Sequence, residues 1–213
     1  MAEMGIFETI YSTRAMRRFK PDPIPEEVLQ KIVEAGTHAP SGGNMQTWGF
    51  LLVRDPELKR FIGDLYFNTW KGIQASLDLP ADMPPAQARM MKAAMHLAEH
   101  LHEVPVILLA CALKEYPPLA GGRHPRMSTA TMHGSIYLAV QNILLACRAL
   151  GVGSVLTTLH CFFEDELKQK LGIPDNMEIA ALLPMGYPQG KFGPTTRRPV
   201  EEVMRWDRWG NTK

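Results

Sequence analysis

The stretch APSGGNMQTWGFLLVR, residues 39–54, joins a polar, glycine-containing loop directly to an apolar run. Its two adjacent glycines carry no side chain, so the backbone of the loop can approach a ligand closely. Ser41, Asn44 and Gln46 add hydrogen-bond donors and acceptors on a short arc, which suits the polar edge of a flat heterocycle. An ordinary turn ahead of a strand explains the same residues, and the stretch taken alone favours that simpler interpretation.

Length and composition limit the classes of protein to consider. The chain has 213 residues, of which 46% are apolar and 21% charged, and its net charge is +1. These values are ordinary for one globular domain and give no field that would attract nucleic acid or an anionic membrane. The longest apolar run, VPVILLACAL at 104–113, has about half the length of a membrane-spanning helix. We expect one domain over 1–213, without nucleic-acid or membrane partners.

The cysteines and the N-terminus indicate the compartment. Cys111, Cys147 and Cys161 are odd in number, and no two form a C-x-x-C pair. Free thiols in a reducing cytoplasm are the simplest interpretation. The first residues include acidic side chains and no long apolar region, so no signal peptide is predicted and the expected location is cytoplasmic.

Sequence patterns predict alternating helices and strands. IPEEVLQKIVEAG, 24–36, has Pro25 suited to the first helical position and Gly36 suited to the stop. A strand is expected over 48–54, and Asp55 should cap the helix that follows. Further helices are predicted over 85–103, 128–150 and 163–172, and strands over 104–113, 153–158 and 177–188. Long helices between short strands predict a three-layer α/β or α+β domain. Element order alone suggests a parallel sheet and does not exclude a mixed one.

Two arginine clusters are candidate anion sites. Arg14, Arg17 and Arg18 fall within five residues, and Arg197 and Arg198 form a second cluster far along the chain. The guanidinium group presents a rigid fork of donors that suits phosphate oxygens. Solvated surface charge is the common alternative for each cluster taken alone.

A histidine-rich segment is a competing candidate. HLAEH, residues 96–100, matches the H-x-x-E-H pattern of inverzincin metallopeptidases, with His96 and His100 one helical turn apart and Glu99 as the base. Three fixed positions match easily by chance, and no further carboxylate ligand is marked downstream. His102 points elsewhere on a helix. We predict no metal site, and we expect one of these histidines to reach a ligand cleft without the sequence indicating which.

Considered together, these segments resemble the nitroreductase family of FMN-dependent nitro and flavin reductases. The resemblance runs from FETIYSTRAMRRFKPDPIP through APSGGNMQTWGFLLVRD and GVGSVLTT to GYPQGKFGPTTRRPVEEV. An early R-x-x-R-x-F, formed by Arg14, Arg17 and Phe19, is followed some 20 residues later by APS-x-x-N-x-Q-x-W. The order and spacing of these motifs are specific, although no single motif is.

The resemblance implies an α+β fold with a central, mostly antiparallel mixed sheet flanked by helices. It also implies an intertwined homodimer in which the C-terminal arm, 188–213, reaches across to the partner. Two FMN sites would then lie at the dimer interface, each with residues from both chains. The segment 63–103 is implied to be the variable cover of the substrate site.

The resemblance further implies roles for individual residues. Basic residues near the N-terminus would hold the phosphate and ribityl chain, and a C-terminal arginine would also hold the phosphate. A loop from the partner would contact the flavin. Backbone N–H groups after the long helix would approach the ring near N5 and O4. The implied cofactor-binding positions are Arg14, Ala15, Arg17, Pro40, Ser41, Asn44, Gln46, Leu156, Thr157, Thr158 and Arg197.

Two positions depart from the family pattern. Ala15 stands where serine is usual, which removes one hydroxyl contact to the flavin. Thr195 stands where many members have lysine, which leaves Arg198 or Lys191 as substitutes. These departures affect individual contacts more than the binding of FMN as a whole.

The activity implied is an FMN-dependent NAD(P)H oxidoreductase. It would work by a ping-pong cycle, with NADH or NADPH as donor and a nitroaromatic, a quinone or a related small molecule as acceptor. No protein side chain is expected to be catalytic, because the cofactor carries the redox chemistry. The alternative of another class is a protein of the same fold that stores, senses or destroys flavin with little reductase turnover.

Overall fold

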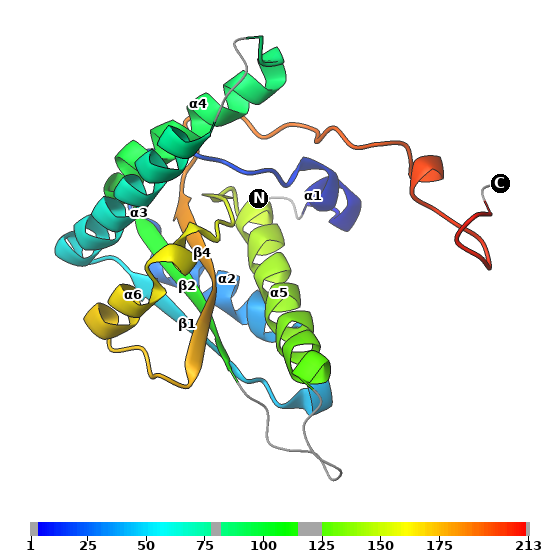
Figure 1. Cartoon of the computed structure of the whole chain (residues 1–213), viewed down its shortest axis with the longest axis horizontal. Helices are drawn as coiled ribbons and strands as arrows, with labels where there is room; N and C mark the ends of the chain where they lie inside the picture. The colour runs from blue at the N-terminus through cyan, green and yellow to red at the C-terminus, as the bar shows by residue number, and fades with distance from the viewer. Residues whose placement is uncertain (1–3, 78–81, 115–124, 212–213) are drawn as a thin grey trace.

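The computed structural model describes residues 4–77, 82–114 and 125–211. These residues form six α-helices and four strands (Figure 1). The helices are α1 (Ile6–Ser12), α2 (Glu26–Thr37), α3 (Pro56–Ser76), α4 (Pro85–His100), α5 (Pro125–Ala149) and α6 (Glu164–Leu171). The strands are β1 (Trp48–Val53), β2 (Val106–Leu113), β3 (Gly153–Ser154) and β4 (Met177–Gly186).

The sheet has the strand order β1-β2-β4-β3, and each neighbouring pair is antiparallel. The parallel sheet suggested by element order is therefore wrong. Two helices, α3 and α4, lie between β1 and β2, so the chain returns to the end of the sheet from which it left. One helix, α5, lies between β2 and β3, and these strands do share a direction, but β4 is inserted between them and pairs with both.

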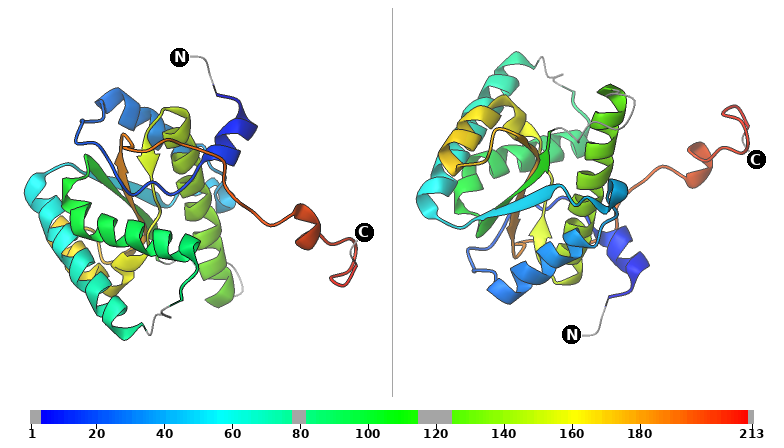
Figure 2. Two further views of the ribbon diagram at one scale, coloured as in Figure 1. Left: turned by 90° about the horizontal axis from the view of Figure 1, so that it is seen from above. Right: turned by 90° about the horizontal axis from the view of Figure 1, so that it is seen from below.

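Helices cover both faces of the sheet, as the views in Figure 2 show. Along β2, Leu108 and Ala110 belong to the core under α2 and α5, whereas Ile107 and Leu109 belong to the core under α3, α4 and α6. Burial on both faces explains why the sequence of β2 is a nearly continuous apolar run rather than an alternating one.

Several local signals are confirmed. The Asp55 side chain accepts a hydrogen bond of 2.8 Å from the Leu58 N–H and caps α3. Gly172 ends α6 in the left-handed conformation, with φ of 67°. The three cysteines are free, and Cys161 is the exposed one.

Within the described residues, no helix is both long and apolar enough to cross a membrane.

Three local predictions need correction. Pro25 is the N-cap of α2 rather than its first residue. Gly36 lies inside the last turn of α2, where an added Cβ would stand 2.8 Å from Ile143 Cγ1, so this glycine permits close packing on α5. The strand predicted over 153–158 is regular only at Gly153–Ser154 and continues as a single bridge between Thr157 and Leu182.

The C-terminal segment leaves the body of the molecule. From Thr195 onward it runs past α1 and projects outward, with one short 3₁₀ turn at Val200–Glu202 (Figure 1). Thr195 fastens the base of this segment, because its N–H and its hydroxyl both donate to the Tyr11 carbonyl oxygen, at 3.1 and 3.3 Å.

Candidate functional site

The segment that carries Arg14 and Arg17 lies beside the segment that follows α5. The Met16 N–H donates to the Ser154 carbonyl oxygen at 3.0 Å. A Cβ added to Gly153 would lie 3.1 Å from Met16 Cβ, so the absence of a side chain there lets the two backbones approach. Two stretches about 140 residues apart in the printed sequence thus form one surface.

Residues 156–158 present two backbone donors to that surface. Thr157 pairs with Leu182 through both its N–H and its C=O, each at 3.0 Å. In an antiparallel pair, the residues on either side direct their N–H groups away from the partner strand. The N–H groups of Leu156 and Thr158 have no acceptor in the part of the chain that the structure describes. Of the three predicted residues, these two have a free backbone donor and Thr157 does not.

The two predicted arginines have no carboxylate partner among residues 4–77, 82–114 and 125–211. Arg14 is exposed, and a terminal nitrogen of its guanidinium would lie 3.8 Å from a Cβ on Gly193. Arg17 is half-buried, and burial lowers its pKa, while the nearby Tyr66 phenol acts in the opposite direction. Two cations without a carboxylate, next to two free N–H donors, fit an anionic cofactor such as FMN.

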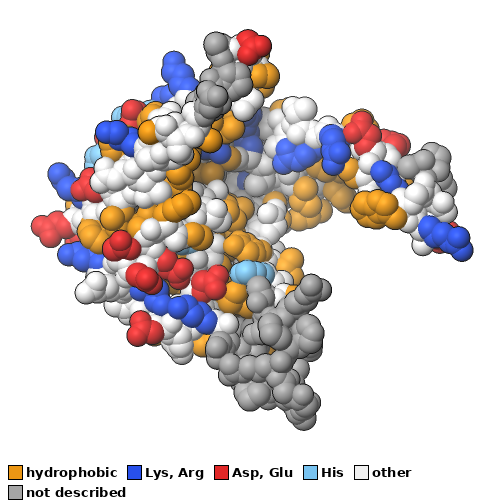
Figure 3. Space-filling view, viewed as in Figure 1, with side chains coloured by type: hydrophobic (Ala, Val, Ile, Leu, Met, Phe, Trp, Pro, Cys, Tyr) orange, Lys and Arg blue, Asp and Glu red, His pale blue; other side chains and the backbone are white. Residues whose placement is uncertain are grey.

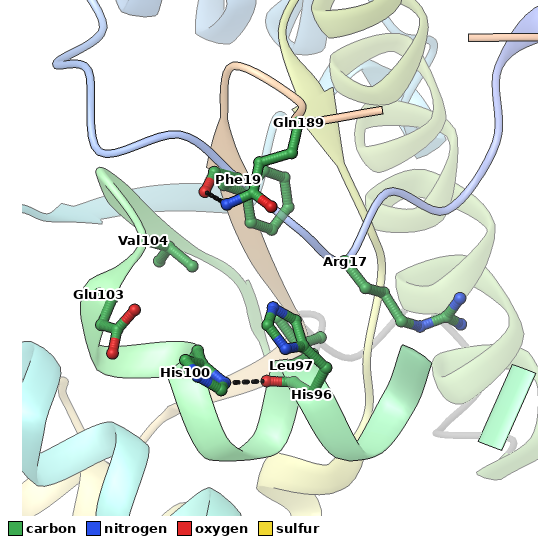
Figure 4. Close-up of a pocket in the computed structure, with 8 residues that line it drawn as sticks. All are labelled: Arg17, Phe19, His96, Leu97, His100, Glu103, Val104 and Gln189. Atoms are coloured by element: carbon green, nitrogen blue, oxygen red, sulfur yellow. Dashed lines mark hydrogen bonds between the residues drawn. The ribbon is translucent and has the colours of Figure 1, made fainter. Parts of the chain in front are cut away.

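A cavity of about 230 Å³ adjoins the Arg17 segment (Figure 4). It lies between the N-terminal segment and the C-terminal turns of α4, and is lined by Arg17, Phe19, His96, Leu97, His100, Glu103, Val104 and Gln189. The Gln189 side-chain amide donates to the Phe19 carbonyl oxygen at 2.8 Å, which fastens the two walls together. The Arg17 guanidinium points away from the two histidines (Figure 4).

Both His96 and His100 line this cavity, whereas His102 does not. The two rings stack with centroids 4.1 Å apart, and Nδ1 of His100 donates to the His96 carbonyl oxygen at 2.8 Å. No group of three His, Cys, Asp or Glu residues within the described chain is placed to hold a metal ion. The arrangement therefore supports the prediction of a histidine at the cleft and gives no support to the zinc alternative.

The predicted loop 40–46 lies elsewhere in the chain. The Gly42 N–H donates to the Ser135 hydroxyl at 3.2 Å, on the first half of α5, and Ser41 Oγ accepts from the Gln46 N–H at 3.1 Å. Asn44 and Gln46 have positive φ angles of 55° and 49°. Because α5 rises about 1.5 Å per residue, some 20 Å of helix separates Ser135 from the residues that follow α5. One chain does not bring this loop to Arg14 and Arg17.

Three other predicted residues are exposed. Pro40 and Ala15 carry no side-chain hydrogen-bonding group. Arg197 lies on the projecting segment, where its guanidinium donates to the Thr196 carbonyl oxygen at 2.8 Å. Figure 3 shows a hollow between the body and this segment, with Lys and Arg side chains along its upper edge.

Sequence reasoning missed some of the residues that line the cavity. Glu103 and Val104 follow α4, and Gln189 follows β4, so their proximity depends on the sheet rather than on any local motif. A usable signal existed for Gln189, which stands in the GYPQGKFG stretch that carries part of the family resemblance.

Comparison with known proteins agrees with the fold and the motifs. The family model "Nitroreductase family" matches residues 10–187. The chain is 32% identical to an NADH dehydrogenase of Thermus thermophilus, over 91% of each chain. It is 29% identical to an iodotyrosine deiodinase of Drosophila melanogaster, covering 86% of this chain and 62% of that protein.

The structural comparison gives the same result. An oxidised iodotyrosine deiodinase bound to FMN and 3-iodo-L-tyrosine superposes with a TM-score of 0.76 and 25% identity, over 95% of this chain and 99% of that one. The antiparallel sheet, the paired segments at its edge and the extent of the family match lead to one conclusion: the chain belongs to the nitroreductase family.

Proposed function

We propose that the protein is an FMN-dependent oxidoreductase that takes electrons from NADH or NADPH and passes them to a nitroaromatic, quinone or related acceptor. One observation carries the proposal. A segment with two arginines that have no carboxylate partner among the described residues is hydrogen-bonded, at one edge of the sheet, to the segment with two outward backbone N–H groups. When bound, FMN supplies hydride chemistry that no side chain provides.

The chain's own groups have separable roles in this proposal. Arg14 and Arg197 neutralise the phosphate, and Arg17 lies nearer the ring because it is half-buried and adjoins Tyr66. The N–H groups of Leu156 and Thr158 donate to the polar edge of the ring, where negative charge accumulates on reduction. The cavity beside Arg17 receives part of the donor or acceptor, and His96 and His100 on the cover segment form its wall.

The test is an absorption spectrum of the purified, desalted protein, followed by chromatography of the pigment that heat releases. About one FMN per chain, lost in Arg14→Ala, supports the proposal. Arg54→Ala is the matched control, because Arg54 pairs with Glu26 at 3.7 Å and follows β1, the edge strand opposite β3. A protein that stays colourless after incubation with FMN would overturn it.

The separation of the 40–46 loop from Arg14 supports a homodimeric site in which a second copy supplies the loop. Exposed apolar side chains on α1 and on the projecting segment add an apolar surface of the kind that binds another chain. They are Ile6, Phe7, Ile10, Tyr11, Val200, Val203, Met204, Trp206 and Trp209.

A subunit-mixing experiment tests this arrangement. Arg14→Ala and Asn44→Gly chains are each stripped of FMN, mixed, and allowed to exchange subunits at an FMN concentration too low to load either variant alone. If a site needs one residue from each chain, heterodimers contain one intact site, and about a quarter of all sites regain FMN. No recovery on mixing, with exchange verified by differently sized tags, would place both residues in one chain or the loop away from the cofactor.

Dehalogenation is a second candidate, favoured by the superposition on the deiodinase that holds FMN and 3-iodo-L-tyrosine. Iodide release from 3-iodo-L-tyrosine under reducing conditions would support it. Storage, sensing or destruction of flavin remains the alternative with little turnover. Steady-state oxidation of NADH and NADPH, with and without a nitroaromatic acceptor, separates these activities on one preparation.

A further inference from the structure

Tyr66 connects α3 to the segment that follows α5. Its side chain is only 5% exposed, and its Oη lies 3.0 Å from Oγ1 of Thr157, 91 residues away. A buried phenol hydrogen needs an acceptor. Either hydroxyl could donate across this contact. Because the phenol is the more buried of the two and Thr157 Oγ1 is its one bonded partner among the described residues, we assign Tyr66 as the donor and Thr157 as the acceptor.

The second lone pair of the same hydroxyl is also used. The Leu159 N–H points to Thr157 Oγ1 at a longer distance of 3.4 Å. With both lone pairs engaged, the hydroxyl hydrogen of Thr157 must point toward a third group. With Tyr66 as the donor, no other acceptor for this hydrogen bonds Thr157 within the described residues, and Thr157 is half-buried rather than enclosed.

Tyr66 also lies within electrostatic reach of Arg17. Burial raises the pKa of the Tyr66 phenol, while the Arg17 charge acts in the opposite direction. The phenol therefore adjoins both segments that the proposed function assigns to the flavin, one on each side of the sheet edge.

We propose that Tyr66 is a positioning residue of the cofactor site: its phenol fixes the Thr157 hydroxyl as a hydrogen-bond donor toward the bound flavin. This inference rests on the proposed function. A donor held in one direction before the cofactor binds costs no reorientation, and it binds a negatively charged acceptor more strongly than a neutral one. Tyr66 thus favours the reduced over the oxidised cofactor without touching it.

The experiment compares Tyr66→Phe, Thr157→Val and the double variant, each loaded with FMN. The measured quantities are the dissociation constants of oxidised and reduced FMN and the two-electron midpoint potential. Each single variant should weaken reduced FMN about tenfold relative to oxidised FMN, which lowers the midpoint by about 30 mV. Because Tyr66 acts only through the Thr157 hydroxyl, the double variant should match Thr157→Val rather than show the sum of the two shifts.

Two further variants make the test specific. Tyr137→Phe removes a hydrogen bond of similar length, 2.9 Å to the Ala180 carbonyl oxygen, on a different face of the molecule, and should leave the midpoint unchanged. Thr157→Ser keeps the hydroxyl and should retain most of the parent midpoint. A lost packing contact alone would not distinguish serine from valine in this way.

The outcomes separate this inference from the proposed function. A parent protein that holds no FMN contradicts the proposed function itself. A parent that holds FMN, with a Tyr66→Phe midpoint equal to the parent's or with additive shifts in the double variant, overturns the role of Tyr66 and leaves the proposed function standing.

Discussion

The imidazole rings of His96 and His100 stack at the rim of the cavity, with centroids 4.1 Å apart and planes inclined by 24°. Two protonated rings at this distance would repel each other, so protonation of one ring disfavours protonation of the other. Burial is the first cause that lowers the pKa of His96, followed by the positive charges of Arg18 and His100. Glu99 and Glu103 oppose this shift without cancelling it.

The first prediction concerns acid stability. An unfolded histidine titrates near pH 6.5, and folded His96 titrates lower, so the unfolded state binds more protons as the pH falls. The free energy of unfolding should therefore be intact above about pH 6.5 and decrease as the pH is lowered toward 5. His96→Gln should lose less thermal stability than the parent over this range, measured by thermal denaturation at pH 7.5 and pH 5.

A suitable control for this prediction is His102→Gln, which alters the same stretch outside the cavity. The buried His160, whose pKa is also lowered chiefly by burial, contributes the same acid sensitivity to all three proteins. Equal losses of stability in the parent and in His96→Gln would contradict the assignment to His96.

The second prediction concerns Arg148, which joins the end of α1 to the segment that follows β4. Its Nε donates to Ser12 Oγ at 2.8 Å, and its guanidinium lies 4.3 Å from the centre of the Phe192 ring. Arg148→Ala should reduce the free energy of unfolding by about 1–2 kcal/mol, from one hydrogen bond and one cation–π contact. It should also weaken FMN retention, because both tethered segments adjoin Arg14.

Urea denaturation and an FMN titration measure these two effects. Arg54→Ala removes an exposed ion pair and should change the stability by less than about 0.5 kcal/mol. If Arg148→Ala were as stable as Arg54→Ala, the contacts of Arg148 with Ser12 and Phe192 would not contribute to stability.

The third prediction compares two glycines of α3. A Cβ on Gly72 would meet nothing within 4 Å, whereas a Cβ on Gly63 would lie 3.1 Å from His102 Cβ and 3.2 Å from the His102 backbone nitrogen. Gly72→Ala should stabilise the protein by about 0.5–1 kcal/mol through helix propensity. Gly63→Ala gains the same propensity but must displace the backbone after α4, so it should destabilise the protein by about 1–2 kcal/mol.

Denaturant midpoints of the two variants provide the measurement, and each serves as the control for the other. Stabilisation of similar size in both would show that η2 (Leu101–Glu103) yields easily to α3.

The fourth prediction isolates the 40–46 loop. Asn44 has a φ of 55°, so alanine there would strain the backbone, whereas glycine removes the amide and keeps the conformation accessible. Asn44→Gly should lower FMN affinity about tenfold, the effect of one good hydrogen bond, and change thermal stability little. Thr37→Ala, on an exposed residue of α2 that bonds its own helix, is the control. FMN affinity equal to the parent's would remove Asn44 from the site.

Much of the fold could be predicted from short-range patterns. The Asp55 cap, the glycine at the end of α6 and the positions of β1, β2 and β4 follow from interactions within a few residues, which are the same in any fold. Strand direction could not be predicted in this way. It depends on how many helices return the chain between two strands, and on β4 entering between β2 and β3.

The candidate site also has a part that short-range sequence patterns predict and a part that they do not. The sequence by itself determined the residue types, because spaced arginines, a glycine-containing polar loop and a threonine pair carry the family resemblance. Only the tertiary structure decided which groups meet. It brings the Thr157 hydroxyl to Tyr66 and the Thr157 N–H to Leu182. It holds the Asn44 loop at Ser135, some 20 Å of helix from the residues that follow α5. Such contacts join residues about 25 to 140 positions apart, so they arise from the packing of whole elements, whereas caps, turns and periodicity arise from near neighbours.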